Sequence, residues 1–137
     1  MKKVFADTLY WIAISRPDDP WRENALKVEK IIGKAQILTT DEVLSEFLTA
    51  LSGSSYTRET AALMVKAILN NAGVKVVPQS HESFLNGFEL YEKRPDKKYS
   101  MTDCISMKVI NNEAITEVLT YDRHFEQEGF NALMSKK

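Results

Sequence analysis

The sequence predicts an α/β protein, a three-layer α/β/α sandwich around a mostly parallel central sheet of four or five strands. Two observations lead to this fold class: short β-like runs recur along the chain, and patterns at helical spacing fill the stretches between them. Strands separated by helices need crossover connections, which join parallel strands and place helices on the faces of the sheet. The length of 137 residues is that of one ordinary domain. No linker rich in Gly, Ser or Pro divides the chain, so we expect a single domain over residues 1–137.

The expected elements alternate along the chain. Strands are expected at KVFA (3–6), QILT (36–39), VKVV (74–77) and EVLT (117–120), with a last short strand near 130–134. Helices are expected over about 8–15, 20–32, 41–51, 80–92, 101–111 and 123–128. An apolar stripe at residues 61, 64, 65, 68, 69 and 72 predicts a further helix, with Gly73 in the position that ends it.

Composition places the chain among soluble globular proteins, with 44% apolar and 27% charged residues. Its one cysteine, Cys104, cannot form an internal disulfide or a zinc cluster, so we expect it in the core of a cytoplasmic protein. Two lysines precede the apolar N-terminal residues, but Asp7 interrupts that stretch before a signal peptide can form. No apolar run approaches the roughly 18 residues that a membrane span needs. We expect neither export nor membrane insertion.

Overall charge excludes one way of holding nucleic acid. The net charge is −1 and the sequence pI is about 6.1, so the chain has no global positive field that would bind a polyanion by counterion release. A polyanionic partner would need local recruitment, for which a bound divalent cation is suited.

Acidic residues follow two of the expected strands. Asp7 ends the first strand, and Asp122 lies just past the strand at 117–120, with only Tyr121 between. In a parallel sheet, ligands gather outside the carboxyl ends of the strands. An Asp at such a junction is also a common helix N-cap. Asp103 is the third residue after Ser100 in SMTD, which matches a capping box, and the helix N-terminus would keep its carboxylate ionised.

The stretch TTDEVLSEFLTAL adds further acids, which their spacing separates. Thr39 and Glu42 match a T-x-x-E capping box, so Glu42 has a structural role and is only a reserve ligand. Glu46 shares the helical face of Glu42 and has no such role. It is either a solvated surface residue or an acid at the rim of a cleft. The buried stripe of this helix is expected to be Val43, Leu44, Phe47, Leu48 and Leu51.

Four carboxylates brought to one sheet edge need a cation. The predicted topology brings Asp7, Asp103 and Asp122 to the same edge and can bring Glu46 there too. Close carboxylates repel one another, and burying them unpaired is costly. Mg²⁺ or Mn²⁺ takes oxygen ligands and binds phosphate oxygens as well. Phosphodiester hydrolysis is a natural chemistry for this set, because such a cation stabilises developing negative charge and lowers the pKa of an attacking water.

Four motifs in this order resemble those of the PIN domains, and in length the chain resembles the stand-alone VapC-type toxins: VFADTLYW, VLSEFL, SMTDCISMKVI and LTYDRHF. The resemblance covers nearly the whole chain. It implies that Asp7, Glu46, Asp103 and Asp122 are the metal-binding and catalytic acids, with Thr8 as the hydroxyl residue that usually follows the first acid. Tyr121 departs from the pattern, since many relatives carry a small residue there, and this affects the expected shape of the pocket.

The resemblance also implies a fold, an activity and partners. The fold would be an α/β/α sandwich with a parallel sheet. The activity would be that of a Mg²⁺- or Mn²⁺-dependent ribonuclease acting on single-stranded or looped RNA. The partners would be a second copy in a homodimer and a small antitoxin that inserts near the acidic pocket.

Basic residues near the acids are candidate contacts for the RNA backbone. The segment EKRPDKKYS (92–100) contains Lys93, Arg94, Lys97 and Lys98, which either grip phosphates or form a solvated loop. Arg123, beside Asp122, either contacts a phosphate or pairs with a neighbouring acid. The candidate substrate-binding residues are Thr8, Arg123, Lys97 and Lys98.

The histidines and large aromatic residues are interpreted structurally. His124 and His81 are possible acid–base groups, but a cation that activates water makes a histidine unnecessary. His124 and Phe125 are interpreted as a packing pair that sets the turn after the strand at 117–120. Tyr10, Trp11 and Trp21 are interpreted as core or dimer-surface residues more than as platforms for RNA bases.

Two alternative functions remain open from the sequence. One is a PIN-like module that has lost its chemistry and binds RNA or a protein, although the presence of all four acids argues against such a loss. The other is a phosphorylated receiver domain, which is also a small α/β protein with an acidic Mg²⁺ pocket. A receiver needs an acid at the end of its central strand, and VKVVPQS carries none there.

Overall fold

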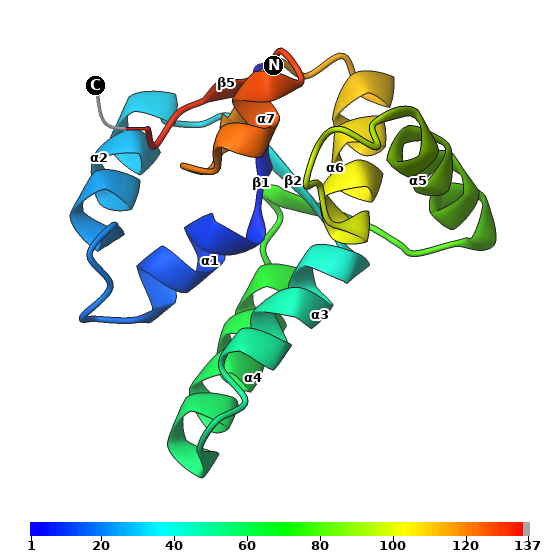
Figure 1. Ribbon diagram of the computed structural model, residues 1–137. Coiled ribbons are helices and arrows are strands. Elements are labelled where there is room, and N and C mark those ends of the chain that lie inside the picture. The colour runs from blue at the N-terminus through cyan, green and yellow to red at the C-terminus, as the bar shows by residue number, and fades with distance from the viewer. Residues whose placement is uncertain (136–137) are drawn as a thin grey trace.

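A five-stranded sheet forms the centre of the molecule. The computed structural model describes residues 1–135, and in it every neighbouring pair of strands is parallel, in the order β3-β2-β1-β4-β5 (Figure 1). The strands are β1 (Lys3–Ala6), β2 (Gln36–Thr40), β3 (Val74–Val77), β4 (Glu117–Leu119) and β5 (Asn131–Ala132). The predicted parallel α/β architecture is confirmed.

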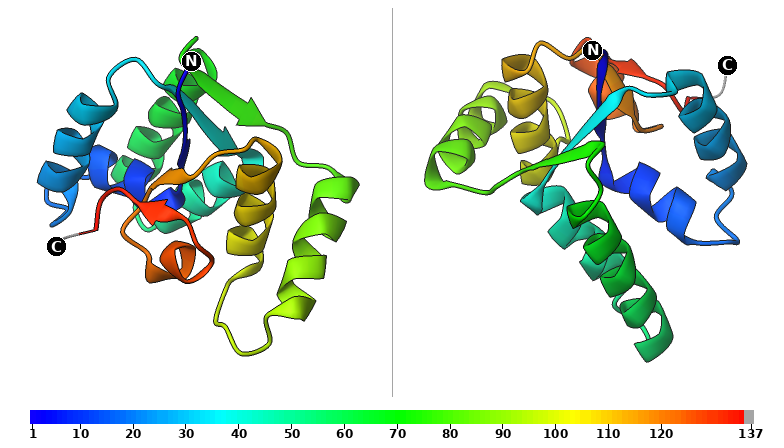
Figure 2. Two further views of the ribbon diagram at one scale, coloured as in Figure 1. Left: turned by 90° about the horizontal axis from the view of Figure 1, so that it is seen from above. Right: turned by 180° about the vertical axis from the view of Figure 1, so that it is seen from behind.

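Helices cover the sheet on both sides. Figures 1 and 2 show α1 and α2 on one side and α5 and α6 on the other, while α3 and α4 extend together beyond the carboxyl ends of the strands. The helices are α1 (Thr8–Ser15), α2 (Arg22–Ile32), α3 (Asp41–Ala50), α4 (Ser55–Leu69), α5 (His81–Lys93), α6 (Met101–Asn112) and α7 (Arg123–Gln127). No helix within residues 1–135 is both long enough and apolar enough to cross a membrane.

The central strand β1 is buried on both faces. Val4, Phe5 and Ala6 have no exposed surface, as expected for a parallel strand with helices on each side. Its register is set by pairing with two neighbours: Val4 lies beside Ile37 of β2, and Phe5 lies beside Val118 of β4. The carboxyl ends of β1 and β4 therefore lie next to each other. The residues that follow these two strands begin at neighbouring positions on the same edge of the sheet.

The contact between α5 and α6 depends on Gly87. A Cβ atom at this position would lie 2.5 Å from Cγ1 of Ile105 and 3.1 Å from the Ile105 backbone nitrogen. Only glycine allows this close approach without displacement of α6. Gly87 thus determines where α6 lies, and with it the acid at the start of α6.

Several local predictions are wrong. Helix α4 ends at Leu69, where the Asn70 side chain donates to the Lys66 carbonyl, so Gly73 does not end it and Ala72 lies beyond it. Leu69 is 58% exposed and Leu48 is 38% exposed, so neither belongs to a buried stripe. The cap of α3 is Thr40, whose hydroxyl accepts from the Val43 amide.

The hydroxyl of Thr39, the residue predicted to cap α3, has another role. It donates to the carbonyl of Ala6 over 2.9 Å and accepts from the Trp11 indole. Because Thr39 is still in β2, its side chain points into the core between β2 and α1 and cannot reach the first amides of α3.

Candidate metal centre and active site

Asp7 connects β1 to α1 and points its carboxylate at the end of β4. It occupies the N-cap position of α1 but makes no side-chain cap hydrogen bond, so the capping interpretation is wrong for this residue. Its amide donates to the Leu119 carbonyl over 3.2 Å. Its Oδ2 atom accepts a 2.9 Å hydrogen bond from the Thr120 hydroxyl. The pairing of β1 with β4 therefore holds the Asp7 side chain in place.

The surroundings of Asp7 disfavour its charged form. Only 3% of the residue is exposed. Burial, and next the nearby negative charge of Asp103, raise the pKa of Asp7 from an ordinary 3.8 to about 7, although the hydrogen bond from Thr120 acts in the opposite direction. Glu46 raises the pKa further by a smaller amount. A cation bound here would stabilise the carboxylate, so Asp7 is suited to be a metal ligand.

Asp103 has a capping role and a place in the site at the same time. The Ser100 hydroxyl accepts from the Asp103 amide over 3.0 Å, and Oδ2 of Asp103 accepts from the Ser100 amide over 3.2 Å. This is the predicted capping box at the start of α6. The same Oδ2 atom lies 3.0 Å from Nδ1 of His124. The capping box fixes the direction of the carboxylate, and 8% of the residue is exposed.

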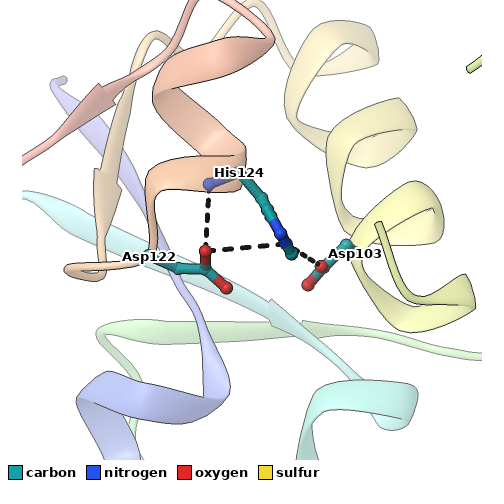
Figure 3. A group of neighbouring side chains, drawn as sticks. All are labelled: Asp103, Asp122 and His124. Atoms are coloured by element: carbon teal, nitrogen blue, oxygen red, sulfur yellow. Dashed lines mark hydrogen bonds and ion pairs between the residues drawn. The ribbon is translucent and has the colours of Figure 1, made fainter. Parts of the chain in front are cut away.

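Asp122 is held by the turn after β4. Its Oδ1 atom accepts from the His124 amide over 2.9 Å, so it caps α7, and its own amide donates to the Thr120 hydroxyl over 3.1 Å. Oδ1 of Asp122 also lies 3.6 Å from Nδ1 of His124. Figure 3 shows Asp103 and Asp122 on opposite sides of the His124 ring.

Glu46 reaches the site from α3. Its Oε1 atom accepts a 2.5 Å hydrogen bond from the hydroxyl of Thr8, at the first position of α1. Thr8, which the sequence placed among the substrate-binding candidates, is thus in contact with an acid of the site. Glu42, the reserve ligand, is half-buried on the same helix but does not line the pocket described next.

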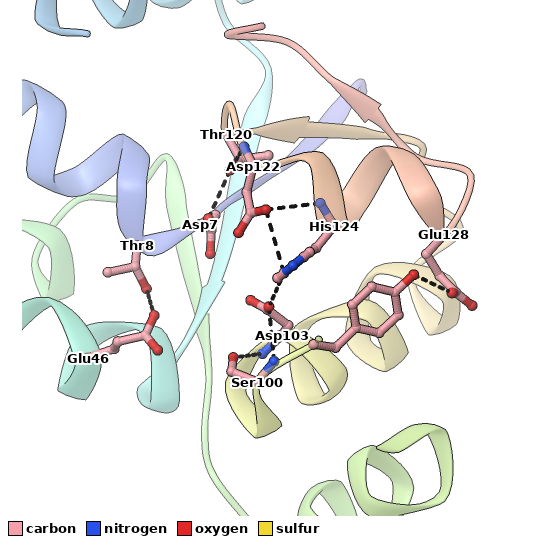
Figure 4. A network of polar contacts seen from close by, with 10 residues as sticks. Asp7, Thr8, Glu46, Ser100, Asp103, Thr120, Asp122, His124 and Glu128 are labelled. Atoms are coloured by element: carbon pink, nitrogen blue, oxygen red, sulfur yellow. Dashed lines mark hydrogen bonds and ion pairs between the residues drawn. The ribbon is translucent and has the colours of Figure 1, made fainter. Parts of the chain in front are cut away.

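All four predicted acids line one pocket of about 350 Å³. They come from four segments far apart in the sequence, and Figure 4 shows them facing the same space. Lys98, which the sequence placed among the substrate-binding candidates, is the only lysine or arginine in the pocket wall formed by residues 1–135. The lining residues are Asp7, Thr8, Leu9, Ile12, Glu46, Ala50, Lys98, Ser100, Asp103, Asp122 and His124.

The donor atoms fit a hard divalent cation. One ligand atom each from Asp103, Asp122 and His124 lies within 4.8 Å of the other two. Among residues 1–135, no lysine or arginine forms an ion pair with any of the four acids. A partly buried set rich in carboxylate oxygen, with no lysine or arginine paired to it among the described residues, suits Mg²⁺ or Mn²⁺.

His124 is the residue that sequence reasoning missed. Phe125 is fully buried, as the packing interpretation required, but His124 points its Nδ1 atom at two acids of the site. Its ring also contacts that of Tyr99, with the centroids 5.4 Å apart. A signal was present in LTYDRHF: an Asp that caps a helix binds the amide two residues later, which holds that residue beside the carboxylate.

The other candidate substrate contacts do not line the acid pocket. Arg123 is exposed, and the half-buried Lys97 pairs with the exposed Asp96 at 3.7 Å. Tyr10 and Trp11 are buried, as predicted. Trp21 is half-buried and stacks on Tyr121, with the ring centroids 4.0 Å apart and the planes 4° apart. The unusual Tyr121 is therefore packed against Trp21, the N-cap residue of α2.

Comparisons with known proteins agree with this geometry. The 23S rRNA-specific endonuclease VapC20 of Mycobacterium tuberculosis is 25% identical over 127 residues, which are 93% of this chain and 95% of that protein. The crystal structure of VapC20, a toxin described as cleaving the sarcin-ricin loop, matches with a TM-score of 0.84 at 21% identity, covering 93% of this chain and 95% of the other.

Two toxin–antitoxin complexes bound to DNA share the fold. VapBC2 of Rickettsia felis matches with a TM-score of 0.70 at 13% identity, covering 95% of this chain and 96% of the other. VapBC of Salmonella typhimurium matches with a TM-score of 0.68 at 12% identity, covering 96% and 97%. The family model of the PIN domain matches residues 4–131. The chain therefore belongs to the PIN domain family.

Proposed function

We propose that the protein is a divalent-metal-dependent endoribonuclease that hydrolyses RNA phosphodiester bonds with water. The observation that carries this proposal is the acid pocket. Four carboxylates from four segments line it, and the most buried of them, Asp7, has a pKa raised to about 7 with no lysine or arginine paired to it within residues 1–135. Such a set is costly in a protein unless a cation binds to it.

The residues of the pocket have separate roles in this proposal. Asp7, Asp103 and Asp122, with Glu46, would hold Mg²⁺ or Mn²⁺, which when bound stabilises negative charge on the phosphate and acidifies the attacking water. Thr120 orients Asp7, and Thr8 orients Glu46, through the hydrogen bonds described above. Lys98, in the wall of the pocket, would contact a phosphate of the RNA.

His124 would hold the two acids on either side of it at a defined separation. Its Nδ1 atom lies within 3.6 Å of an oxygen of each. We assign it a positioning role, in which its Nδ1 atom donates to these acids.

The biological role that we propose is that of a toxin in a toxin–antitoxin pair. Supporting this, the VapC20 relative is named as an rRNA endonuclease, and solved neighbours of the same fold are VapBC complexes. We propose an antitoxin as a protein partner, a homodimer as the assembly and the cytoplasm as the location. A single PIN domain spanning residues 1–137 is part of the same proposal.

Cleavage of RNA with and without metal tests the enzyme. We expect purified protein to cut RNA with Mg²⁺ or Mn²⁺ and to stop when a chelator is added. Asp7→Asn should reduce the rate at least about 100-fold, as expected for loss of a group that acts on the transition state. A matched pair of variants on α3 sharpens the test: Glu46→Gln should be impaired, whereas Glu42→Gln, outside the pocket, should cut normally.

The same assay separates the enzyme from an inactive RNA-binding module. Protein that binds RNA but cuts none with either cation would be a module without chemistry, and the proposal would be wrong. Expression in a bacterial host tests the proposed role as a toxin. Growth arrest and discrete RNA ends should appear with wild type and not with Asp7→Asn.

A further inference from the structure

A ladder of aromatic rings lies on the exposed face of α5. His81, Phe84, Phe88 and Tyr91 stack in sequence, with centroids 6.2, 6.4 and 6.5 Å apart and planes within 15° of parallel. Phe88 is 42% exposed and Tyr91 is 52% exposed. The adjacent face of α5 is buried at Gly87 and Leu90, and Gly87 packs on Ile105 of α6, whereas Phe84, Phe88 and Tyr91 are exposed and are not part of the core. Aligned exposed rings are typical of a binding surface.

Phe88 and Tyr91 form one wall of a pocket of about 600 Å³, larger than the acid pocket. The other wall is the loop between α5 and α6. The lining residues are Phe88, Tyr91, Glu92, Arg94, Pro95, Lys97, Lys98 and Tyr99. The pocket thus combines flat apolar surfaces with cationic side chains. We name it the aromatic pocket.

Shared residues connect the aromatic pocket to the acid pocket. A small pocket of about 260 Å³ is lined by Asp96, Lys97, Lys98, His124 and Gln127. It shares Lys97 and Lys98 with the aromatic pocket, and it shares Lys98 and His124 with the acid pocket. The three pockets therefore adjoin one another through shared residues, and we call this row of pockets the track. Lys98 lines all three pockets and makes no ion pair within residues 1–135.

The loop along this track is anchored. The Nε and Nη2 atoms of Arg94 donate to the two carboxylate oxygens of Glu128, over 3.1 and 2.9 Å. The hydroxyl of Tyr99 donates to Oε1 of Glu128 over 2.9 Å. Both ends of the segment 94–99 are thus tied to one residue that directly follows α7, the helix that carries His124. The wall of the aromatic pocket is held in a defined position beside the acids.

We propose that the aromatic pocket is a subsite for an unpaired nucleobase of the RNA, next to the phosphate that is cut. The inference rests on the proposed function and adds where the substrate strand runs. An unpaired base stacks on aromatic rings, and the phosphates beside it need cations. The pocket offers Phe88 and Tyr91 for the base, and the track offers Lys97 and Lys98 for the backbone between base and acids.

Binding of a short fluorescent single-stranded RNA, compared with an abasic oligomer of the same length, tests the subsite. Measurements are made with Mg²⁺ in the Asp7→Asn background, in which the RNA stays intact. The background protein should prefer RNA over the abasic oligomer by about tenfold or more, the value of one stacked base. The double variant Phe88→Ala with Tyr91→Ala should lose that preference, while its weak affinity for the abasic oligomer should not change.

Matched variants separate stacking from general damage. Leu85→Ala removes an apolar side chain that is 50% exposed on the same helix but outside the aromatic pocket, so the preference for RNA should remain. Phe88→Trp and Tyr91→Phe keep a ring at each position and should also preserve it. If the double variant retains the preference of the background protein, the subsite is wrong.

The remaining outcomes are also decisive. If wild type cuts RNA with Mg²⁺ but the double variant retains its preference for bases, only the subsite fails. If wild type neither binds nor cuts RNA, the proposed function fails together with the subsite. If the double variant binds RNA as before but changes mass in sedimentation, the ring ladder is an interface between copies of the chain, which also overturns the inference.

Discussion

The hydroxyl of Thr120 donates a 2.9 Å hydrogen bond to Oδ2 of Asp7, a residue 113 positions earlier in the chain. The same hydroxyl accepts from the amide of Asp122 over 3.1 Å. One buried threonine therefore links the first and last acids of the pocket. It also opposes the rise in the pKa of Asp7, because its hydrogen bond favours the charged carboxylate.

Replacing Thr120 should weaken metal binding. Thr120→Val removes both hydrogen bonds, so the pKa of Asp7 should rise further and its carboxylate should be less well oriented. We expect a loss of about tenfold or more in Mn²⁺ affinity near neutral pH, as for other residues that support metal ligands. Titration calorimetry measures it. Thr39→Val is the matched control, because Thr39 is also fully buried but its hydroxyl bonds to Ala6 and Trp11 and to no acid of the pocket; unchanged affinity is expected there.

Metal affinity should depend on pH through Asp7. A cation binds the deprotonated carboxylate, and the pKa of that group in the metal-free protein is about 7. Affinity should therefore fall by up to about tenfold for each pH unit below 7 and level off above it. Calorimetry in buffers with different ionisation enthalpies should detect the released proton. A flat affinity profile from pH 5 to 8 would show that Asp7 is already ionised in the metal-free protein.

Removing the charge of Asp7 should stabilise the metal-free protein at high pH. The folded-state pKa of about 7 lies above the ordinary 3.8, so the folded state holds this proton more tightly than the unfolded state. The free energy of unfolding therefore falls as pH rises from about 4 to about 7. The Asp7→Asn variant has no carboxylate to ionise, so its free energy of unfolding does not fall in this way. At pH 8 it should be more stable than wild type, with an upper limit of about 4 kcal/mol.

Urea denaturation with a chelator at pH 5 and pH 8 measures this effect. The stability difference between Asp7→Asn and wild type should be larger at pH 8 than at pH 5. An equal difference at both values would show that the charge of Asp7 does not destabilise the fold.

Gly87→Ala should destabilise the protein, in the opposite direction to the usual effect in helices. Alanine normally stabilises a helix interior by about 1 kcal/mol relative to glycine. Here the added Cβ would lie 2.5 Å from the Ile105 side chain and 3.1 Å from its backbone, so α5 and α6 must separate. We expect a net loss of about 1–3 kcal/mol in the free energy of unfolding. Gly53→Ala, where nothing lies within 4 Å of the new atom, should be close to neutral.

The sequence predicted the parts of the fold that have a short-range cause. Alternating strand and helix patterns place β1 and β3 at the bounds observed, and the Ser100 capping box is present as expected. The convergence of Asp7 and Asp122 follows from a rule about parallel sheets that needs no coordinates. These features depend on residues close together in the chain, or on topology alone.

Features that depend on tertiary neighbours were not predicted. The hydrogen bond from Thr120 to Asp7 joins segments that are distant in the chain, so the sequence around either residue does not predict it. The direction of the His124 side chain depends on where α6 places Asp103. The predicted end of α4 was wrong because the Asn70 side chain donates to the Lys66 carbonyl in the last turn of the helix. The spacing of apolar residues gives no information about this contact.

The helix caps at Asp103 and Asp122 have a consequence for the resting protein. Both carboxylates are oriented by backbone amides, so folding has already ordered them before any ion arrives. Binding then requires little rearrangement, unlike in small zinc domains that collapse without their metal. The apoprotein should consequently survive dialysis against a chelator in its native shape and regain activity as soon as the cation is restored.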